Sequence, residues 1–568
     1  WADYDGALIS AGGGVWSRAE KSIPISPQAR QALGIEADKL SPAELLAAIL
    51  KAPVDLLYNG GIGTYVKASA ESHADVGDRA NDALRVDGRE LRCRVLAEGG
   101  NLGCTQRGRI EAALHGAAGA GVRLNTDAID NSAGVDTSDH EVNIKILLGL
   151  SISDGEMTDR QRNTLLPQMT DEVAALVLRD NYFQTQALSV AARQGVALLD
   201  QQGRFIRFLE KIGRLNRAIE HLPGDDELAE RKAHGIGLTR PELAVLLAYG
   251  KMWLSDELMQ SDLPEDPWIA QALRRYFPAP LRDRFAGCIA RHPLRREIIA
   301  THVLNSMLNR VGATFVHRLS DATGATPAQV VRAYLATREV YGFVALWQQI
   351  DALDNRVADQ VQSELLIELG RLGSHATTWF LRSRRLSEPM EQLVGRYAPA
   401  VQVLCSQATA DAPAGSRASG WLQAGVPAGL VEAVDSAEAL FAALDVADIA
   451  EACGRPLALA AELHAGLGAC LGLVRLRQQI DALPATSYWQ TLAKVALSDD
   501  VAGLQRSIAH DVVGRGSGDS AAAMLASWEQ LNRGALERAR RLLAEFGDAK
   551  AVDLAMLSVA LRELRNLA

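Results

Sequence analysis

Short apolar runs alternate with glycine-rich turns between about residues 52 and 134. These runs predict strands at residues 54–58, 92–97, 122–124 and 128–130. A helix precedes the first strand, because Ser41 and Glu44 match a capping box and Pro42 suits the first helical position. Strands that alternate with helices and tight turns are typical of a parallel sheet with crossover helices, so we expect an α/β segment here.

From about residue 141 to the end, apolar residues recur every three or four positions, which predicts amphipathic helices. Thr239 and Thr326, each followed closely by a proline, are predicted to cap two of them. Glycine, proline and aspartate gather in predicted loops at residues 221–226, 263–267, 411–415 and 514–519. We therefore expect an α/β domain over residues 1–150 and an all-α region over residues 151–568, with sub-boundaries near residues 225, 265 and 412.

The composition is that of a packed protein and excludes several classes. Of the 568 residues, 48% are apolar and 23% are charged, and the net charge of −10 argues against nucleic acid as a partner. Six scattered cysteines without a CxxC pair predict neither a disulfide framework nor a metal site, and they favour the cytoplasm. No apolar run reaches the roughly 18–20 residues of a membrane span, so no membrane partner is expected. Because the chain begins at Trp1 and not at Met, we expect a piece of a longer polypeptide.

Glycine and asparagine residues follow the predicted strands. No HExxH, GxSxG, Walker or complete GxGxxG motif is present, so these turns carry the main chemical signal. In open α/β sheets, ligands bind beyond the carboxyl ends of the strands. The candidate ligand contacts are Asn59, Gly60, Gly61, Gly99, Gly100, Asn101 and Asn131. Each asparagine is also a normal turn residue, but three at successive strand ends favour ligand binding.

Three segments together resemble a known family. Residues 131–138, Asn-Ser-Ala-Gly-Val-Asp-Thr-Ser, resemble the signature of glutamate and related amino-acid dehydrogenases. Residues 97–101 look like the Ala-Glu-Gly-Ala-Asn of the same enzymes, and residues 54–61 resemble their preceding strand end. Residues 52–67 and 237–249 narrow the likeness to the large, NAD-specific bacterial glutamate dehydrogenases. Ser132, Ala133 and residues 102–105 depart from the pattern of the short enzymes.

This resemblance implies a fold and a function. It implies a partial Rossmann-like domain, a doubly wound parallel sheet that lacks its first βαβ unit, followed by a large helical region that assembles a homo-oligomer. The reaction would be oxidative deamination of L-glutamate to 2-oxoglutarate and ammonia with NAD as cofactor. Ser138 would contact the side-chain carboxylate of the substrate, and the asparagines and glycines named above would contact NAD. The catalytic lysine and aspartate of the family lie upstream, so we expect no catalytic residue in this chain and no activity from it alone.

Other interpretations stay open at this stage. Ser138 with Glu141 also matches a capping box, so its hydroxyl is a candidate helix cap. Glu98 is a candidate general base or acceptor for a cofactor hydroxyl, or a carboxylate at a helix terminus. The whole chain could be a helical scaffold with a degenerate dinucleotide-binding half-domain, or part of a dehydrogenase for another amino acid.

Overall fold

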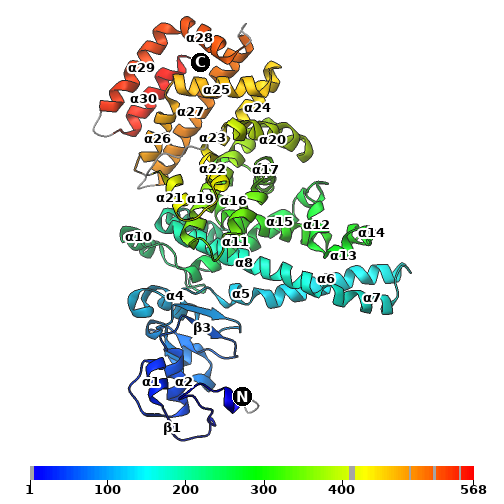
Figure 1. Cartoon of the computed structure of the whole chain (residues 1–568), viewed down its shortest axis with the longest axis vertical. Coiled ribbons are helices and arrows are strands. Elements are labelled where there is room, and N and C mark those ends of the chain that lie inside the picture. Colours follow the sequence, from blue (N-terminus) through cyan, green and yellow to red (C-terminus); the bar gives the residue numbers. More distant parts are fainter. Residues whose placement is uncertain (1–4, 408–415, 485–487, 516–519, 549–551, 568) are drawn as a thin grey trace. The chain divides into compact units, whose positions relative to one another are not determined.

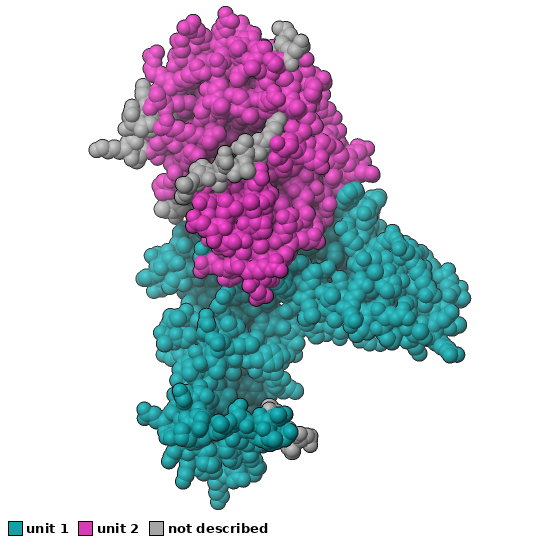
Figure 2. Space-filling view, in the orientation of Figure 1, with its two compact units in different colours: residues 1–331 teal, residues 332–568 magenta. Residues whose placement is uncertain are grey.

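The computed structural model describes residues 5–407, 416–484, 488–515, 520–548 and 552–567. The chain divides into two compact units, residues 1–331 and residues 332–568, which Figure 2 shows in teal and magenta. The strands of the described residues lie between Ile23 and Glu98, in the blue part of Figure 1, and helices form most of the remainder. The expected order, an α/β segment followed by an all-α region, is confirmed. The division at residue 150 stays a prediction.

Three pairs of short strands build the α/β segment. β3 (Leu56–Asn59) runs parallel to β6 (Val95–Glu98), with Asn59 opposite Glu98. β4 (Val66–Lys67) runs parallel to β5 (Val86–Asp87). β1 (Ile23–Pro24) is antiparallel to β2 (Lys39–Leu40). The helices of this segment are α1 (Pro27–Leu33), α2 (Pro42–Leu50), α3 (His73–Val76), α4 (Gln106–His115) and α5 (Asp127–Asp130).

Two of the four predicted strands form, and each starts later than predicted. The predicted strand at residues 122–124 is reduced to one bridge, between Arg123 and Val95. The predicted strand at residues 128–130 is wrong, because these residues belong to helix α5. Its two apolar residues are too few to distinguish the period of a strand from that of a helix. The Asp130 carboxylate at the end of α5 instead accepts a hydrogen bond from the Glu98 backbone N–H, at 3.0 Å.

A small apolar core lies beneath the strand ends. It contains Val66, Val86, Leu91, Cys93, Leu96, Cys104, Ala112, Val122 and Leu124, all of them buried. The residues come from β4, β5, β6, α4 and the segments around them, so the core joins both parallel strand pairs to α4. Burial of this apolar surface fixes the two glycine turns that follow β3 and β6.

Helices complete the first unit: α6 (Ser132–Ser153), α7 (Asp159–Leu165), α8 (Thr170–Gln194), α9 (Leu199–Lys211), α10 (Asp225–Ala233), α11 (Arg240–Met259), α12 (Gln271–Tyr276), α13 (Ala279–Arg282), α14 (Ala286–Ala290), α15 (Arg295–Val311) and α16 (Phe315–Thr323). α8 packs against α6, α11 and α15. α17 (Pro327–Val340) contains the division between the units.

The described residues of the second unit are helical: α18 (Phe343–Asp351), α19 (Asp359–Arg382), α20 (Met390–Gln407), α21 (Arg417–Gln423), α22 (Ala428–Asp435), α23 (Ala437–Leu440), α24 (Ala442–Cys453), α25 (Leu457–Cys470), α26 (Leu473–Ala482), α27 (Tyr488–Arg515), α28 (Ala521–Leu531), α29 (Arg533–Asp548) and α30 (Leu554–Arg565). Large side chains fill its core, among them the fully buried Phe343, Phe380 and Tyr397. Within the described ranges, no single helix has the length and apolar composition of a membrane span, although α25 and α26 together, bent by 65°, pass that test.

The predicted helix caps are confirmed. Ser41 and Glu44 form a reciprocal capping box at α2, and Thr239 and Glu242 form another at α11. Thr326 and Gln329 bond in the same way before α17. Residues 221–224 form the predicted loop before α10, whereas residues 263–265 form a 3-10 turn. The predicted loop at residues 411–415 lies outside the described residues, and so do residues 516–519 of the last predicted loop. Its first two residues, 514 and 515, are the end of helix α27.

Candidate functional site

The glycine turns after β3 and β6 meet at the carboxyl ends of the two strands. The backbone N–H groups of Gly99 and Gly100 both donate to the Asn59 carbonyl oxygen, at 2.8 and 3.2 Å. The Asn59 side-chain oxygen accepts a hydrogen bond from the Gly61 N–H, at 3.3 Å. Asn59 therefore ties its own turn to the turn of the neighbouring strand.

Close packing explains why the second turn has two glycines. A Cβ atom on Gly99 would collide with the Tyr58 hydroxyl, and one on Gly100 would collide with the Gly61 carbonyl oxygen. A Cβ atom on Gly61 would lie 3.6 Å from its nearest neighbour, which is an ordinary contact. Glycine is thus sterically required at position 100, where the contact is with backbone. At position 99 a side chain would have to displace the exposed Tyr58 ring, and space alone does not require glycine at position 61. Gly60 and Gly61 are exposed.

Two further candidate residues meet at the same place. The Asn131 side-chain amide donates a hydrogen bond to the Asn101 side-chain oxygen, at 3.0 Å. The Asn101 Nδ2 and the Asn131 Oδ1 have no hydrogen-bond partner among the described residues. One donor and one acceptor at this strand end are therefore available to a ligand.

Two carboxylates of helix α5 hold the turn after β6 in place. The Asp127 carboxylate accepts a hydrogen bond from the Leu102 N–H, at 2.8 Å, and Asp130 holds the N–H of Glu98. Leu102 has a φ of 56°, which is uncommon for a residue with a side chain, and the Asp127 bond helps to hold it. The turn after β6 is thus fixed by carboxylates and by packing together.

The Glu98 carboxylate caps neither α4 nor α5, whose N-cap residues are Thr105 and Thr126. Its buried carboxylate forms a bidentate ion pair with Arg109 of α4, with N–O distances of 2.7 and 2.9 Å. A second carboxylate, that of Asp127, lies 3.2 Å from the same guanidinium group. Burial raises the pKa of Glu98. Burial, together with the neighbouring Glu98 carboxylate, raises the pKa of the Cys104 thiol well above its usual value. Glu98 is a structural residue that joins β6 to α4.

Ser138 lies inside helix α6 and does not cap it. The helix begins at Ser132, six residues earlier, so the capping interpretation of Ser138 is wrong. The exposed Ser138 hydroxyl donates a long bond of 3.4 Å to the Gly134 carbonyl oxygen. Asn131, seven residues before Ser138, lies two helical turns away on the same face, about 10 Å along the axis.

A polar cluster beside this motif was not predicted from the sequence. Asp136 of α6 is partly buried, its Oδ2 has no hydrogen-bond partner among the described residues, and burial raises its pKa to about 6. Lys251 of α11 is partly buried, and loss of hydration lowers its pKa to about 8 although Asp180 and Asp136 act against the shift. The Lys251 ammonium group donates to Gln184, which itself donates to Ser132. Clusters with shifted pKa values are typical of functional sites.

The sequence signal for this cluster is weak. Asp136 lies within the motif at residues 131–138, but Asp180 and Lys251 lie on α8 and α11, far along the chain. Only the packing of three helices brings their charges together. Among the described residues, no group of three or more histidine, cysteine, aspartate or glutamate side chains is arranged to hold a metal ion.

Two family models match the chain. "Glutamate dehydrogenase, C-terminal" matches residues 235–566, which is more than half of the chain. "Bacterial NAD-glutamate dehydrogenase, catalytic domain" matches residues 1–191, which include the glycine turns and the motif at residues 131–138.

Curated relatives match along the entire chain. Proteins named NAD-specific glutamate dehydrogenase from Pseudomonas aeruginosa, Halomonas elongata and Mycobacterium tuberculosis are 45%, 44% and 40% identical to it, over 575, 579 and 580 residues. Each match covers 100% of this chain and 35% of the relative. The chain thus spans about a third of the length of these relatives. It belongs to the bacterial NAD-glutamate dehydrogenase family.

Proposed function

We propose that this chain is the C-terminal part of an NAD-dependent glutamate dehydrogenase, which converts L-glutamate to 2-oxoglutarate and ammonia. One observation carries the proposal. Asn59, Gly99, Gly100, Asn101 and Asn131 come from three separate segments and meet at the carboxyl ends of parallel strands. This is the edge of an α/β sheet at which ligands bind.

The pair β3 and β6 belongs, in this proposal, to a doubly wound Rossmann-like sheet that lacks its first βαβ unit. Among the described residues, β3 pairs with β6 only, so its other edge is open. The side chains of Leu56 and Tyr58, on one face of β3, are 57% and 64% exposed. Large apolar side chains of a central strand are normally covered, and further sheet and helix elements of the whole polypeptide would cover them.

The strand-end residues suit the nicotinamide end of NAD. A carboxamide has one acceptor and one donor group, which complement the Asn101 Nδ2 and the Asn131 Oδ1. Gly99 and Gly100 have no side chain that would keep a ligand away from the backbone. When bound, the cofactor would accept the hydride from the α-carbon of glutamate. Asn59, Gly60 and Gly61 would shape the opposite wall.

Ser138 would bind the side-chain carboxylate of glutamate. Its hydroxyl is exposed, its present bond to Gly134 is long, and a carboxylate would be a stronger acceptor. Ser138 follows Asn131 by seven residues, about 10 Å at the rise of a helix, so the two side chains would contact different ligands. The family assigns proton transfer to a lysine and an aspartate outside this chain.

Location and assembly are part of the same proposal. The six cysteines are free thiols, which supports a reducing cytoplasm. The helical region beyond residue 150 is proposed to form a homo-oligomer, because hydride transfer gives it no other task. Removal of residues 332–568 from the natural polypeptide should lower the number of subunits in the assembly, obtained by dividing the light-scattering mass by the mass of the shortened subunit. An unchanged number of subunits would contradict the assembly role.

The experiment that tests the function uses the full natural polypeptide that contains this chain. It is supplied with L-glutamate and NAD, and NADH formation is followed for the parent and for Ser138→Ala. Thr137→Ala is the matched control, because Thr137 is also exposed and also bonds a backbone carbonyl one turn back, but faces another direction. We expect Ser138→Ala to raise the KM for glutamate by about tenfold to a hundredfold, the worth of a hydrogen bond to a charged group. The control should keep the parent value.

Two results would contradict the proposal. No NADH from the intact polypeptide would favour a non-catalytic scaffold. NADH formed faster from L-leucine or L-valine than from L-glutamate would assign the enzyme to another amino acid.

A further inference from the structure

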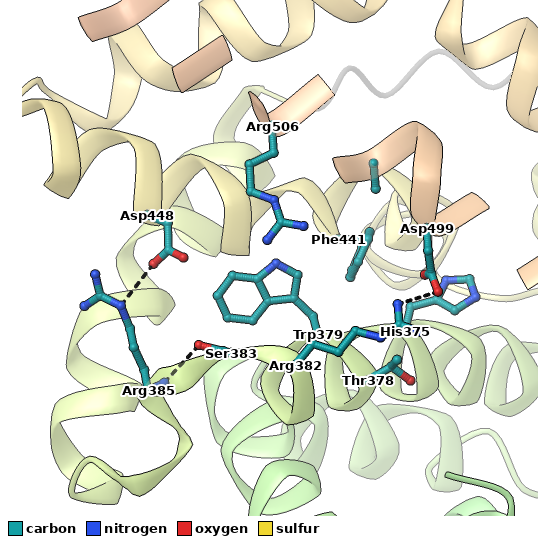
Figure 3. A pocket seen from close by; sticks show the side chains of 11 residues that line it. His375, Thr378, Trp379, Arg382, Ser383, Arg385, Phe441, Asp448, Asp499 and Arg506 are labelled. Atoms are coloured by element: carbon teal, nitrogen blue, oxygen red, sulfur yellow. Dashed lines mark hydrogen bonds and ion pairs between the residues drawn. The ribbon is translucent and has the colours of Figure 1, made fainter. Parts of the chain in front are cut away.

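A pocket of about 260 Å³ lies within the second unit and shares no residue with the site described above. It is lined by residues of α19, α24 and α27 and of the segments next to them. Figure 3 shows aromatic and charged side chains around it, with three arginines among them: Arg382, Arg385 and Arg506. Its volume suits a small molecule, not a segment of a macromolecule.

Each arginine is paired with at least one carboxylate, and Arg385 also lies 3.7 Å from Asp448 and 3.9 Å from Glu388. Arg382 pairs with Asp499 across the pocket, at 2.5 Å. Arg385 pairs with Glu451 of α24, at 2.8 Å. The remaining N–H groups of Arg382, a side chain that is 52% exposed, have no partner among the described residues. The guanidinium groups are therefore fixed in direction, and they keep donors for another acceptor.

Arg506 is the arginine best placed to bind a ligand. Its Nε lies 3.2 Å from the Asp445 carboxylate, and its guanidinium carbon lies 5.9 Å from the centre of the Trp379 ring. Both terminal Nη nitrogens lack a hydrogen-bond partner among the described residues. Figure 3 shows this guanidinium group above the indole ring of Trp379, between the side chains of Asp448 and Phe441.

The support beneath Arg506 is buried and rigid. The Asp445 side chain is 3% exposed and also accepts a hydrogen bond from the Trp379 indole N–H, at 2.8 Å. One carboxylate thus positions both the guanidinium group and the aromatic ring on which it lies. A binding group that is already held in place loses little entropy when a ligand binds.

The unused hydrogen-bonding groups favour an anion. Each of the three guanidinium charges is balanced by a carboxylate, that of Asp499, Glu451 or Asp445, and the carboxylates that line the pocket are those of Asp448 and Asp499. Asp499 is already paired with Arg382, and Asp448 accepts a hydrogen bond from Tyr397, at 2.8 Å. The unused hydrogen-bonding capacity is therefore that of donors. The rings of Trp379 and Phe441 provide an apolar wall.

We propose that this pocket binds a small oxyanion, a carboxylate or phosphate group, through the Nη donors of Arg506 and the free donors of Arg382. Guanidinium groups match both anions in a bidentate manner, so the geometry specifies their shared chemistry. The apolar wall would contact the short body of an organic anion. The proposal does not depend on glutamate oxidation, because no residue of the pocket belongs to the strand-end site.

The test measures binding by isothermal titration calorimetry on the full natural polypeptide. The probes are inorganic phosphate and succinate at constant ionic strength, with chloride as the reference anion. We expect at least one probe to bind more tightly than chloride, and Arg506→Gln to weaken that binding by about tenfold or more. Stronger binding of phosphate would identify a phosphate ligand, and stronger binding of succinate a carboxylate ligand. The difference in binding heat between the parent and Arg506→Gln measures binding at this pocket. Binding of the probe at other sites is the same in both proteins and cancels.

Matched variants make the result decisive. Arg515→Gln changes an arginine of the same helix that does not line the pocket, and it should keep the parent affinity. Arg506→Lys keeps the charge but not the planar donors, so it should bind with intermediate affinity. Arg382→Gln, at a half-exposed side chain, serves if Arg506→Gln fails to fold. Equal affinity in the parent, Arg506→Gln and Arg382→Gln, or no binding above chloride, would overturn the proposal.

Discussion

Several glycines of the α/β segment have opposite surroundings to several glycines of the helical second unit. In the α/β segment, a Cβ atom on Gly88, Gly99, Gly100 or Gly103 would collide with backbone or side-chain atoms of other segments. In the helical second unit, a Cβ atom on Gly370, Gly395, Gly420, Gly429 or Gly503 would meet nothing within 4 Å. The first set allows close packing between segments, and the second set lies on helices with space around it. A glycine is informative about function only where its surroundings exclude a side chain.

The ion pairs of the α/β segment and of the second unit differ in how far they are buried. The pair of Glu98 and Arg109 beneath the strand ends is almost fully buried, with side chains 1% and 5% exposed. The arginines of the pocket in the second unit are part-exposed and keep free donors. The first pair holds the turns rigid, whereas the second set is available to a ligand. The following predictions test this contrast.

The largest effect is expected from Arg109→Leu. It leaves the Glu98 carboxylate buried without its partner, which should lower the free energy of unfolding by about 3–5 kcal/mol. Urea denaturation of the chain measures the change. The control is Arg94→Leu, because Arg94 forms an exposed pair with Asp55 in the same segment and should lose less than about 1 kcal/mol. Equal losses in the two variants would contradict a structural role for the buried pair.

Gly100→Ala should have the next largest effect. The new methyl group would strike the Gly61 carbonyl oxygen, and the displaced turns should cost about 1–3 kcal/mol of unfolding free energy. Gly61→Ala is the control, because its methyl group fits at ordinary contact distance and should change stability by less than about 0.5 kcal/mol. If Gly61→Ala proves less stable than Gly100→Ala in thermal denaturation, the contact described between Gly100 and the Gly61 carbonyl oxygen is contradicted.

The pKa of Asp136 predicts a pH dependence of stability. Burial raises its pKa in the folded state to about 6, above the unfolded value of 3.8, so the folded state holds this proton more firmly. The contribution to stability is full below pH 3.8 and is lost as the pH rises to about 6. Relative to Asp136→Asn, the parent should therefore lose up to about 3 kcal/mol across this window. The control Thr137→Ala should differ from the parent in free energy of unfolding by the same amount at every pH. If the difference between Asp136→Asn and the parent also does not change with pH, the raised pKa of Asp136 is refuted.

The smallest effect is expected in the second unit, and it has the opposite sign. Gly503→Ala on α27 meets no neighbouring atom and removes a flexible residue from a helix interior. It should raise the free energy of unfolding by about 0.5–1 kcal/mol. A destabilised Gly503→Ala variant in urea denaturation would show that glycine surroundings do not separate the two parts.

The fold could be predicted where local signals act alone. The caps at Ser41, Thr239 and Thr326 and the two strands that end at glycine turns follow from neighbouring residues, and the structure confirms them. The prediction of a strand at residues 128–130 is wrong because a run of two apolar residues is too short to show a period. The interpretation of Ser138 as a helix cap is wrong because the helix begins earlier, at Ser132.

The site could be predicted only in part. The sequence identifies the asparagines and glycines after β3 and β6, because they follow apolar runs. The third predicted strand end, at Asn131, is wrong, because Asn131 lies between helices α5 and α6 and reaches the site through its bond to Asn101. It does not predict that Glu98 pairs with Arg109, since a carboxylate after a strand has no local sign of its partner. Nor does it predict that Lys251 and Asp136 approach each other, because that depends on how three helices pack.

The central claim is that the strand-end asparagines bind the cofactor while Ser138 binds the substrate. The most direct test is the KM for NAD of the full natural polypeptide with Asn131→Ala, compared with its KM for L-glutamate. Loss of one hydrogen bond should raise the KM for NAD by about five- to tenfold and leave the KM for glutamate at the parent value. An unchanged KM for NAD, or an equal rise in both constants, would contradict the account.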